Sequence, residues 1–143
     1  MYEQIVYVSL AMPDVDAQGA YDIISMSHNR NSKHGLTGTL ILMDGFFLQV
    51  LEGHRHALRE RFAIIAADPR HTDVSVRQSI AISERTFPDE WMALRHGDAV
   101  DESLKLDFAY VPGFPATHFG GEKLVEFARA CYQPYRKTQS AAL

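Results

Sequence analysis

The sequence predicts an α+β fold: one sheet in the ferredoxin-like order βαββαββ, two helices on one face of it, and C-terminal helices after it. The main observation is a hairpin at residues 36–53, in which Asp44-Gly45 separates two apolar runs. Asp-Gly favours a tight hairpin turn because both central residues of that turn need a positive φ. Both runs are almost continuously apolar, which is typical of strands covered on both faces in the middle of a sheet. One strand and one helix before the hairpin, and one helix and two strands after it, complete the predicted order.

The first strand is predicted at residues 3–11, which are rich in β-branched side chains. Alternation puts Ile5, Tyr7 and Ser9 on one face, so that face is more polar than an ordinary core face. A helix is predicted next, at 15–29, from apolar residues at helical spacing. A polar loop leads from this helix into the hairpin.

Gln49 interrupts the second apolar run of the hairpin. A buried amide has up to four hydrogen-bonding sites, and each unpaired site costs about 1–3 kcal/mol. From this strand alone, Gln49 is either a core amide with satisfied hydrogen bonds or a residue that faces a polar ligand. In the predicted order the first and third strands are central neighbours, so we expect Tyr7 and Gln49 to lie on adjacent strands.

A second helix is predicted at 55–67, with a buried stripe formed by Leu58, Phe62 and Ile65. A fourth strand is predicted at 74–86. The charged residues of the helix are expected to face solvent: Arg55, Arg59, Glu60 and Arg61.

The fifth strand is predicted at 90–95, after a break at Phe87-Pro88-Asp89. Regular alternation there would put Glu90 and Met92 on one face and Trp91 on the other. Met92 is expected to face Gln49, and Trp91 to face away from it.

The composition changes after residue 97, and a short helix is predicted at 98–107 with Asp98 as its cap. An amphipathic helix is predicted at 121–136, and the chain is expected to fray from about Lys137. Its apolar stripe must be buried against the open face of the sheet or against another chain. The stripe consists of Leu124, Ala128, Cys131 and Tyr135.

The composition limits the possible functions of the chain. A length of 143 residues predicts one domain with a short appendage, and a formal net charge of −4 gives no support to nucleic-acid or acidic-membrane binding. No membrane span or signal-peptide pattern is visible, so we expect a cytoplasmic protein. Cys131 is the only cysteine, which excludes an internal disulfide. His54 and His56 lack a third ligand at suitable spacing, so no metal site is expected.

Five segments of the chain carry a resemblance to one family. They read IVYVSLA, SMSHNRNSKHGLTG, DGFFLQVLEG, DPRH and RTFPDEWM. In order and spacing they resemble BLUF domains, the blue-light sensors that use flavin, over about residues 3–95. The resemblance implies a photosensor domain at residues 1–97 and a helical extension at 98–143, as in short BLUF proteins.

The resemblance also implies an oxidised flavin bound non-covalently between the two helices, usually FAD, with FMN or riboflavin as alternatives. The family's photoactive tyrosine falls on Tyr7, its switching glutamine on Gln49, and the methionine near that glutamine on Met92. The family commonly has a tryptophan two residues before this methionine, where the chain has Glu90. The residues implied to bind the cofactor are Tyr7, Ser27, Arg30, Asn31, Gln49, Arg70 and His71.

Two parts of this implied site have distinct roles. The amide of Asn31 would pair with the donor–acceptor edge of the flavin, with Arg30 beside it. Arg70 and His71 match a pair near the far end of the cofactor, where a phosphate contact is expected.

The implied residue types suit a light-driven switch. Tyr7 is an oxidisable phenol with an exchangeable proton, and Gln49 carries a donor and an acceptor on one amide. Rotating or tautomerising that amide rearranges hydrogen bonds worth about 1 kcal/mol each, so the change can reverse in the dark. Cys131 lies far along the chain in the C-terminal helix, which argues against cysteine-adduct photochemistry.

The sequence leaves three functions open. The resemblance favours a non-enzymatic photosensor that signals by self-association or through a separate effector protein, without binding nucleic acid or membrane directly. The alternative is a small flavin-dependent reductase, or a hydrolase using Arg30 and Asn31, although no nucleophile–base pair is visible. The third is an oligomerising adaptor without a ligand, in which Gln49 is a core amide.

Overall fold

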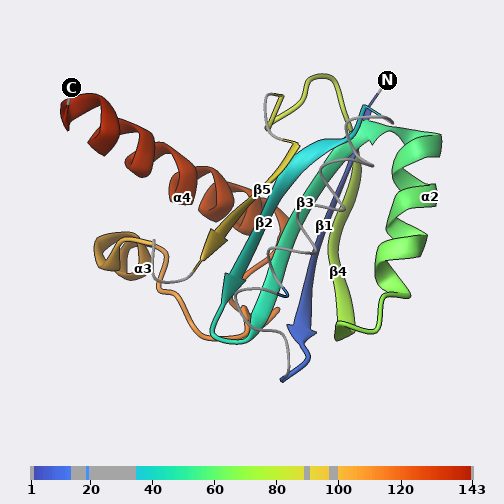
Figure 1. The fold of residues 1–143 in the computed structure, drawn as a ribbon, viewed down its shortest axis with the longest axis horizontal. Helices are drawn as coiled ribbons and strands as arrows, with labels where there is room; N and C mark the ends of the chain where they lie inside the picture. Colours follow the sequence, from blue (N-terminus) through green and yellow to red (C-terminus); the bar gives the residue numbers. More distant parts are fainter. Residues whose placement is uncertain (1, 14–18, 20–34, 89–90, 97–99, 143) are drawn as a thin grey trace.

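The computed structural model describes residues 2–13, 19, 35–88, 91–96 and 100–142, with the backbone alone at 91–96 and from 132 onward. Five strands form one sheet in the order β4-β1-β3-β2-β5 (Figure 1). β1, β3, β2 and β4 pair antiparallel, and β5 joins β2 in parallel. The strands are β1 (Tyr2–Ala11), β2 (Thr37–Met43), β3 (Phe46–His54), β4 (His71–Ile82) and β5 (Trp91–His96). The helices are α2 (Arg55–Ala66), α3 (Glu102–Asp107) and α4 (Gly121–Ala142).

This strand order confirms the predicted α+β, ferredoxin-like sheet, with β1 and β3 as central neighbours. The predicted helix at 15–29 lies outside the described residues, except for Gly19, which is helical. No helix in the described part of the chain is long and apolar enough to cross a membrane.

The hairpin turn between β2 and β3 forms where the sequence predicted it. Asp44 and Gly45 have φ values of 53° and 82°, and Met43 pairs with Phe46 across the turn. Positive φ at both central residues matches the turn type that Asp-Gly favours. The β2 strand is buried along its whole length, and β3 is buried from Phe47 to Gly53, as expected for strands covered on both faces.

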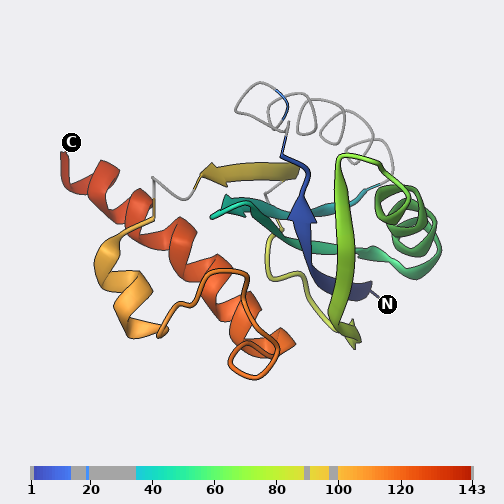
Figure 2. The ribbon, with the colours of Figure 1, turned by 90° about the horizontal axis from the view of Figure 1, so that it is seen from below.

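Alternation along the central strands divides their side chains between two apolar cores. Val6 and Val8 of β1 belong to a core completed by α3 and α4, here called the α4-side core. Ile5 belongs to a second core that includes Leu58 of α2, here called the α2-side core. Figure 2 shows α3 and α4 together below the sheet.

The stripe of α4 packs on the sheet of its own chain. Leu124, Ala128 and Cys131 are buried in the α4-side core, which decides between the two predicted partners of that stripe. The side chain of Tyr135 lies outside the described residues. An aromatic cluster fills the space between helix and sheet, and its fully buried members are Phe114, Phe119 and Phe127.

Three predictions about the helices are wrong. Arg61 of α2 is buried rather than solvent-facing, because it lies one turn from the buried Leu58. The short helix α3 begins at Glu102 with Asp101 at its N-cap, so the predicted cap at Asp98 is three residues too early. Finally, α4 is helical to Ala142 instead of fraying from Lys137.

Two strand predictions also need correction. β4 spans His71–Ile82 instead of 74–86, because its pairing with β1 begins directly after the α2 turn. At the start of β5, Trp91 and Ala93 pair with the consecutive residues Gly38 and Thr39, so Met92 is the extra residue of a bulge. A bulge breaks the regular alternation on which the expected faces of Trp91 and Met92 depended.

Gly38 lies at this bulge, and its φ of +152° is one that other residues rarely adopt. A Cβ on Gly38 would lie 1.8 Å from the carbonyl oxygen of Val50, in the neighbouring strand. We therefore expect Gly38→Ala to lower the free energy of unfolding by about 3 kcal/mol or more. Chemical denaturation measures this loss.

The matched control is Gly120→Ala, since a Cβ on Gly120 meets nothing within 4 Å. Gly120 precedes α4, where the change should cost less than about 1 kcal/mol. Equal losses of unfolding free energy in Gly38→Ala and Gly120→Ala would show that contact with Val50 is not the cause of the destabilisation.

Candidate functional site

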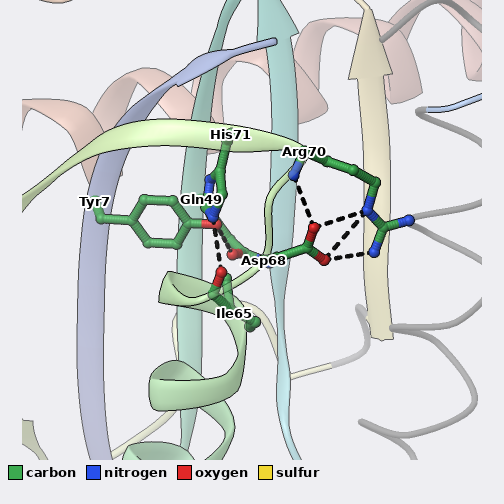
Figure 3. Close-up of polar contacts among 6 residues, drawn as sticks. All are labelled: Tyr7, Gln49, Ile65, Asp68, Arg70 and His71. Atoms are coloured by element: carbon green, nitrogen blue, oxygen red, sulfur yellow. Dashed lines mark hydrogen bonds and ion pairs between the residues drawn. The ribbon is translucent and has the colours of Figure 1, made fainter. Parts of the chain in front are cut away.

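Tyr7 and Gln49 form the centre of the candidate site. They are directly opposed across β1 and β3, and both are 2% exposed. The Tyr7 hydroxyl donates a hydrogen bond to Gln49 Oε1 (Figure 3). The expected contact between these two side chains is therefore confirmed.

The ring of Tyr7 is enclosed by side chains from α2 and β4. Its centroid lies 5.7 Å from that of Phe62 and 5.9 Å from that of His71. Burial raises the pKa of the Tyr7 phenol far above its usual value, and the nearby negative charge of Asp68 adds to this. Tyr7 is therefore a neutral phenol that retains its proton throughout the physiological pH range.

His71 connects three elements beside Tyr7. Its Nε2 lies 2.7 Å from the carbonyl oxygen of Ile65 at the end of α2, and its Nδ1 lies 2.7 Å from Ser9 Oγ in β1 (Figure 3 shows the first contact). A carbonyl oxygen only accepts, so Nε2 carries the proton. In the neutral imidazole, Nδ1 then accepts a hydrogen bond from the Ser9 hydroxyl.

Asp68 and Arg70 form an ion pair at the partly exposed edge of the site. Arg70 Nη2 lies 2.5 Å from Asp68 Oδ2, and Arg70 Nε lies 2.9 Å from Asp68 Oδ1. The backbone N–H of Arg70 also donates to Oδ1, at 2.9 Å. The hydrogen bond from the Arg70 side chain holds the pKa of Asp68 below its usual value. The edge of the site thus carries one fixed carboxylate and one guanidinium.

The structure brings together four of the residues that the sequence indicated: Tyr7, Gln49, Arg70 and His71. Ser27, Arg30 and Asn31 lie outside the described residues. The backbone of Met92 lies in β5, two strands away from β3, and its side chain is not among those described.

Sequence reasoning missed two partners in this site. Asp68 was not singled out, although an acid two residues before Arg70 could have suggested a pair. Ser9 was placed on the correct face of β1, but its bond to His71 depends on the pairing of β1 with β4. His56 pairs instead with Glu60 on the surface of α2, and no group of described residues could hold a metal ion.

The side chains of the site fit a flavin in their chemistry. A flavin edge presents hydrogen-bond donors and acceptors side by side, and Gln49 offers both kinds of group on one amide. Tyr7 supplies an oxidisable phenol at the same point, shielded from water. At the edge, Arg70 supplies the planar cation that suits a phosphate.

Comparison with known proteins gives one family. The family model described as BLUF, sensors of blue-light using FAD, matches residues 2–93. Subunit beta of the photoactivated adenylate cyclase of Euglena gracilis is 34% identical over 87 residues, which cover 61% of this chain and 10% of that protein. The chain therefore spans about a tenth of the length of this relative.

Two solved structures are similar over most of the chain. The dark-state structure of BlrB, a BLUF protein, is 28% identical with a TM-score of 0.74, and the match covers 90% of this chain and 93% of that chain. Klebsiella pneumoniae BlrP1 with FMN and cyclic diGMP is 28% identical with a TM-score of 0.67, and the match covers 72% of this chain and 28% of that chain. The likeness to BlrB confirms the predicted fold and the assignment to short BLUF proteins.

The buried phenol of Tyr7 predicts a pH dependence of stability. The unfolded chain loses this proton near pH 10, whereas the folded protein keeps it because burial raises the pKa of Tyr7. Above about pH 10 the unfolded state binds fewer protons, so the free energy of unfolding falls by up to about 1.4 kcal/mol per pH unit. This contribution is fully present below about pH 10.

Urea unfolding between about pH 8 and pH 11 measures the effect, with Tyr7→Phe as the comparison. The wild type should lose stability more steeply above about pH 10 than the variant. Burial also raises the pKa of Tyr110, but Tyr110 is present in both proteins. Parallel slopes would show that Tyr7 is not held in its neutral form by the fold.

Proposed function

The chain belongs to the BLUF family, the sensors of blue light using FAD, and from that premise we propose how its residues turn light into a rearranged hydrogen bond. The observation that carries the proposal is the buried hydrogen bond from Tyr7 to Gln49. It joins the only oxidisable group at the centre of the described site to an amide that can rearrange. The two side chains come from adjacent central strands, which hold them in register.

FAD bound beside Tyr7 and Gln49 would supply the absorption of blue light and an acceptor for one electron. Tyr7 would give up that electron and then its phenol proton, along the hydrogen bond to Gln49 Oε1, and both would return to Tyr7 once the Gln49 amide has rearranged. Gln49 responds by rotating or tautomerising, so that it presents a different donor and acceptor to the flavin edge. The new arrangement differs by about 1 kcal/mol per hydrogen bond, which allows thermal return in the dark.

We assign the remaining cofactor contacts from the family pattern and from the geometry at the edge of the site. Ser27, Arg30 and Asn31 are proposed to bind the flavin, with the Asn31 amide paired to the donor–acceptor edge of its ring. Arg70 is proposed to meet the phosphates, in exchange for part of its pairing with Asp68. His71 is proposed to lie near the same end and to act there mainly by fixing α2 to the sheet, since both its nitrogens have protein partners. Met92, which lies in β5, is proposed to respond to the rearrangement of the Gln49 amide.

We propose that residues 1–97 form the photosensor and that residues 98–143 form its output extension. The packing of Leu124 and Phe127 on the sheet supports a direct mechanical connection between the two. The proposed output is association, either with further copies of the chain or with a separate effector protein. We propose a non-enzymatic, cytoplasmic sensor, and the net charge of −4 supports the absence of nucleic-acid contacts.

Tyr7→Phe and Gln49→Leu test the mechanism. Both variants should bind FAD but lose the reversible red shift that blue light induces in the wild type. Phenylalanine cannot give up a phenol proton, and leucine offers no second hydrogen-bonding arrangement. Absorption spectra before and after illumination measure the shift.

Tyr110→Phe is the matched control, because Tyr110 donates to Asp44 and packs with the aromatic rings of the α4-side core. It should shift like the wild type. A full red shift in Tyr7→Phe would remove Tyr7 from the mechanism, and one in Gln49→Leu would remove Gln49. Light-dependent consumption of a reductant, with no shift in any protein, would point instead to a flavin-dependent reductase.

A further inference from the structure

Glu52 is a buried acid for which the photochemistry above has no role. It lies on β3 with a relative exposure of 0%, three residues after Gln49 and on the opposite face of the strand. Glu52 Oε2 accepts a hydrogen bond from Gln4 Nε2 at 2.8 Å. Glu52 Oε1 accepts one from the backbone N–H of Phe87, also at 2.8 Å. The acid therefore fastens the connection between β4 and β5 to the central strand.

The hydrogen-bond chain continues from Gln4 to Gln78, which lies against the start of α4. Gln4 Oε1 accepts a hydrogen bond from Gln78 Nε2 of β4 at 2.8 Å. Gln78 lies against the first residue of α4, since a Cβ on Gly121 would lie 2.8 Å from Gln78 Oε1 and 2.3 Å from Gln78 Cβ. Close by, Arg77 Nη1 donates to the carbonyl oxygen of Phe119 at 3.0 Å. The hydrogen bonds thus join Phe87 to three strands, and their last member, Gln78, contacts the first residue of α4.

A carboxylate at position 52 sets the direction of every bond in this chain. It can only accept, so Gln4 must turn its NH2 group toward Glu52 and its oxygen toward Gln78. Gln78 must then turn its own NH2 group toward Gln4, which leaves Gln78 Oε1 beside the first turn of α4. The N–H groups of that turn have no partner within the helix, so an oxygen there suits them and an NH2 group does not.

We propose that Glu52 is the positioning residue for the output: it orients Gln4 and Gln78 and thereby couples strand β3 to both the β4–β5 connection and the start of α4. This proposal rests on the proposed function, because the coupling carries a signal only if Gln49 responds to light. Phe87 precedes the first residue of β5, Trp91, by four positions. A displacement of β3 at Gln49 would therefore reach the β4–β5 connection through Glu52, and the start of α4 through Glu52, Gln4 and Gln78.

Glu52→Gln tests the direction of the chain. The new amide keeps its oxygen on the Phe87 N–H and turns its NH2 group toward Gln4. Gln4 and Gln78 must then reverse, which brings an NH2 group to the first turn of α4. In the double variant Gln4→Glu/Glu52→Gln, the carboxylate at position 4 accepts from both neighbours, and Gln78 returns to its original orientation.

Two further variants complete the set. Gln78→Leu removes the last amide of the chain, at a half-buried position, and with it the donor to Gln4 Oε1. Glu84→Gln is the matched control, because Glu84 is exposed in the same connection between β4 and β5 and loses the same charge. All variants are full-length chains with FAD bound.

Backbone amide hydrogen exchange in the dark gives the first readout. Glu52→Gln and Gln78→Leu should speed exchange in the first turn of α4 on the order of tenfold and leave Phe87 within about twofold of the wild type. The double variant and Glu84→Gln should match the wild type at both places. Faster exchange at Phe87 alone, or no rescue in the double variant, would overturn the proposal. If Glu52→Gln does not fold, the exchange rates of Gln78→Leu and the double variant still test the proposal.

The second readout is the same exchange under blue light. The wild type, Glu84→Gln and the double variant should show a light-dependent change in the first turn of α4, whereas Glu52→Gln and Gln78→Leu should lose it. All of them should keep the wild-type red shift, because the chain lies on the face opposite Gln49. A light response of α4 in every variant would overturn the coupling and leave the photosensor intact. Absence of the red shift in the wild type would instead refute the proposed function, with the dark comparison still valid.

Discussion

The antiparallel pairing of β1 with β3 is the constraint on which the rest of the structure depends. Its register places Tyr7 opposite Gln49 and Gln4 opposite Glu52. Positions 4 and 7 are three positions apart along β1, an odd interval, so the two polar pairs lie on opposite faces of the sheet. A slip by one residue would exchange the faces of all these side chains and drive polar groups into both apolar cores. One register therefore defines the candidate site and the hydrogen-bond chain behind it.

Apolar packing on both sides keeps this register in place. Val6 and Val8 pack with α4, while Ile5 packs with the core that includes Leu58 of α2. Polar groups buried between such layers are tolerated only when they have hydrogen-bond partners. The Tyr7–Gln49 pair and the Gln4–Glu52 pair meet this condition. Each adds a side-chain hydrogen bond between β1 and β3.

The polarity of the site changes from its centre to its edge. At the centre, burial keeps Tyr7 neutral, which retains the proton that a light-driven transfer requires. At the edge, the guanidinium of Arg70 holds Asp68 in its charged form. His71 lies between the two and fixes the end of α2 through Ile65 and the first strand through Ser9. A neutral photoactive centre beside a charged rim suits a cofactor with an apolar ring system at one end and phosphates at the other.

The sequence by itself determined the features that depend on local pattern. The Asp44-Gly45 turn, the order of the strands and the apolar stripe of α4 follow from backbone preferences and from side-chain periodicity, which act over a few residues. The segments around Tyr7 and Gln49 also indicated the family. Only the tertiary structure decided that the stripe of α4 covers its own sheet, that Arg61 is buried, and that a bulge falls at Met92. The role of Glu52 was likewise hidden, because its partners come from residue 4 and residue 87. Contacts between positions so far apart in the chain depend on strand register and on the packing of whole layers, which no local pattern contains.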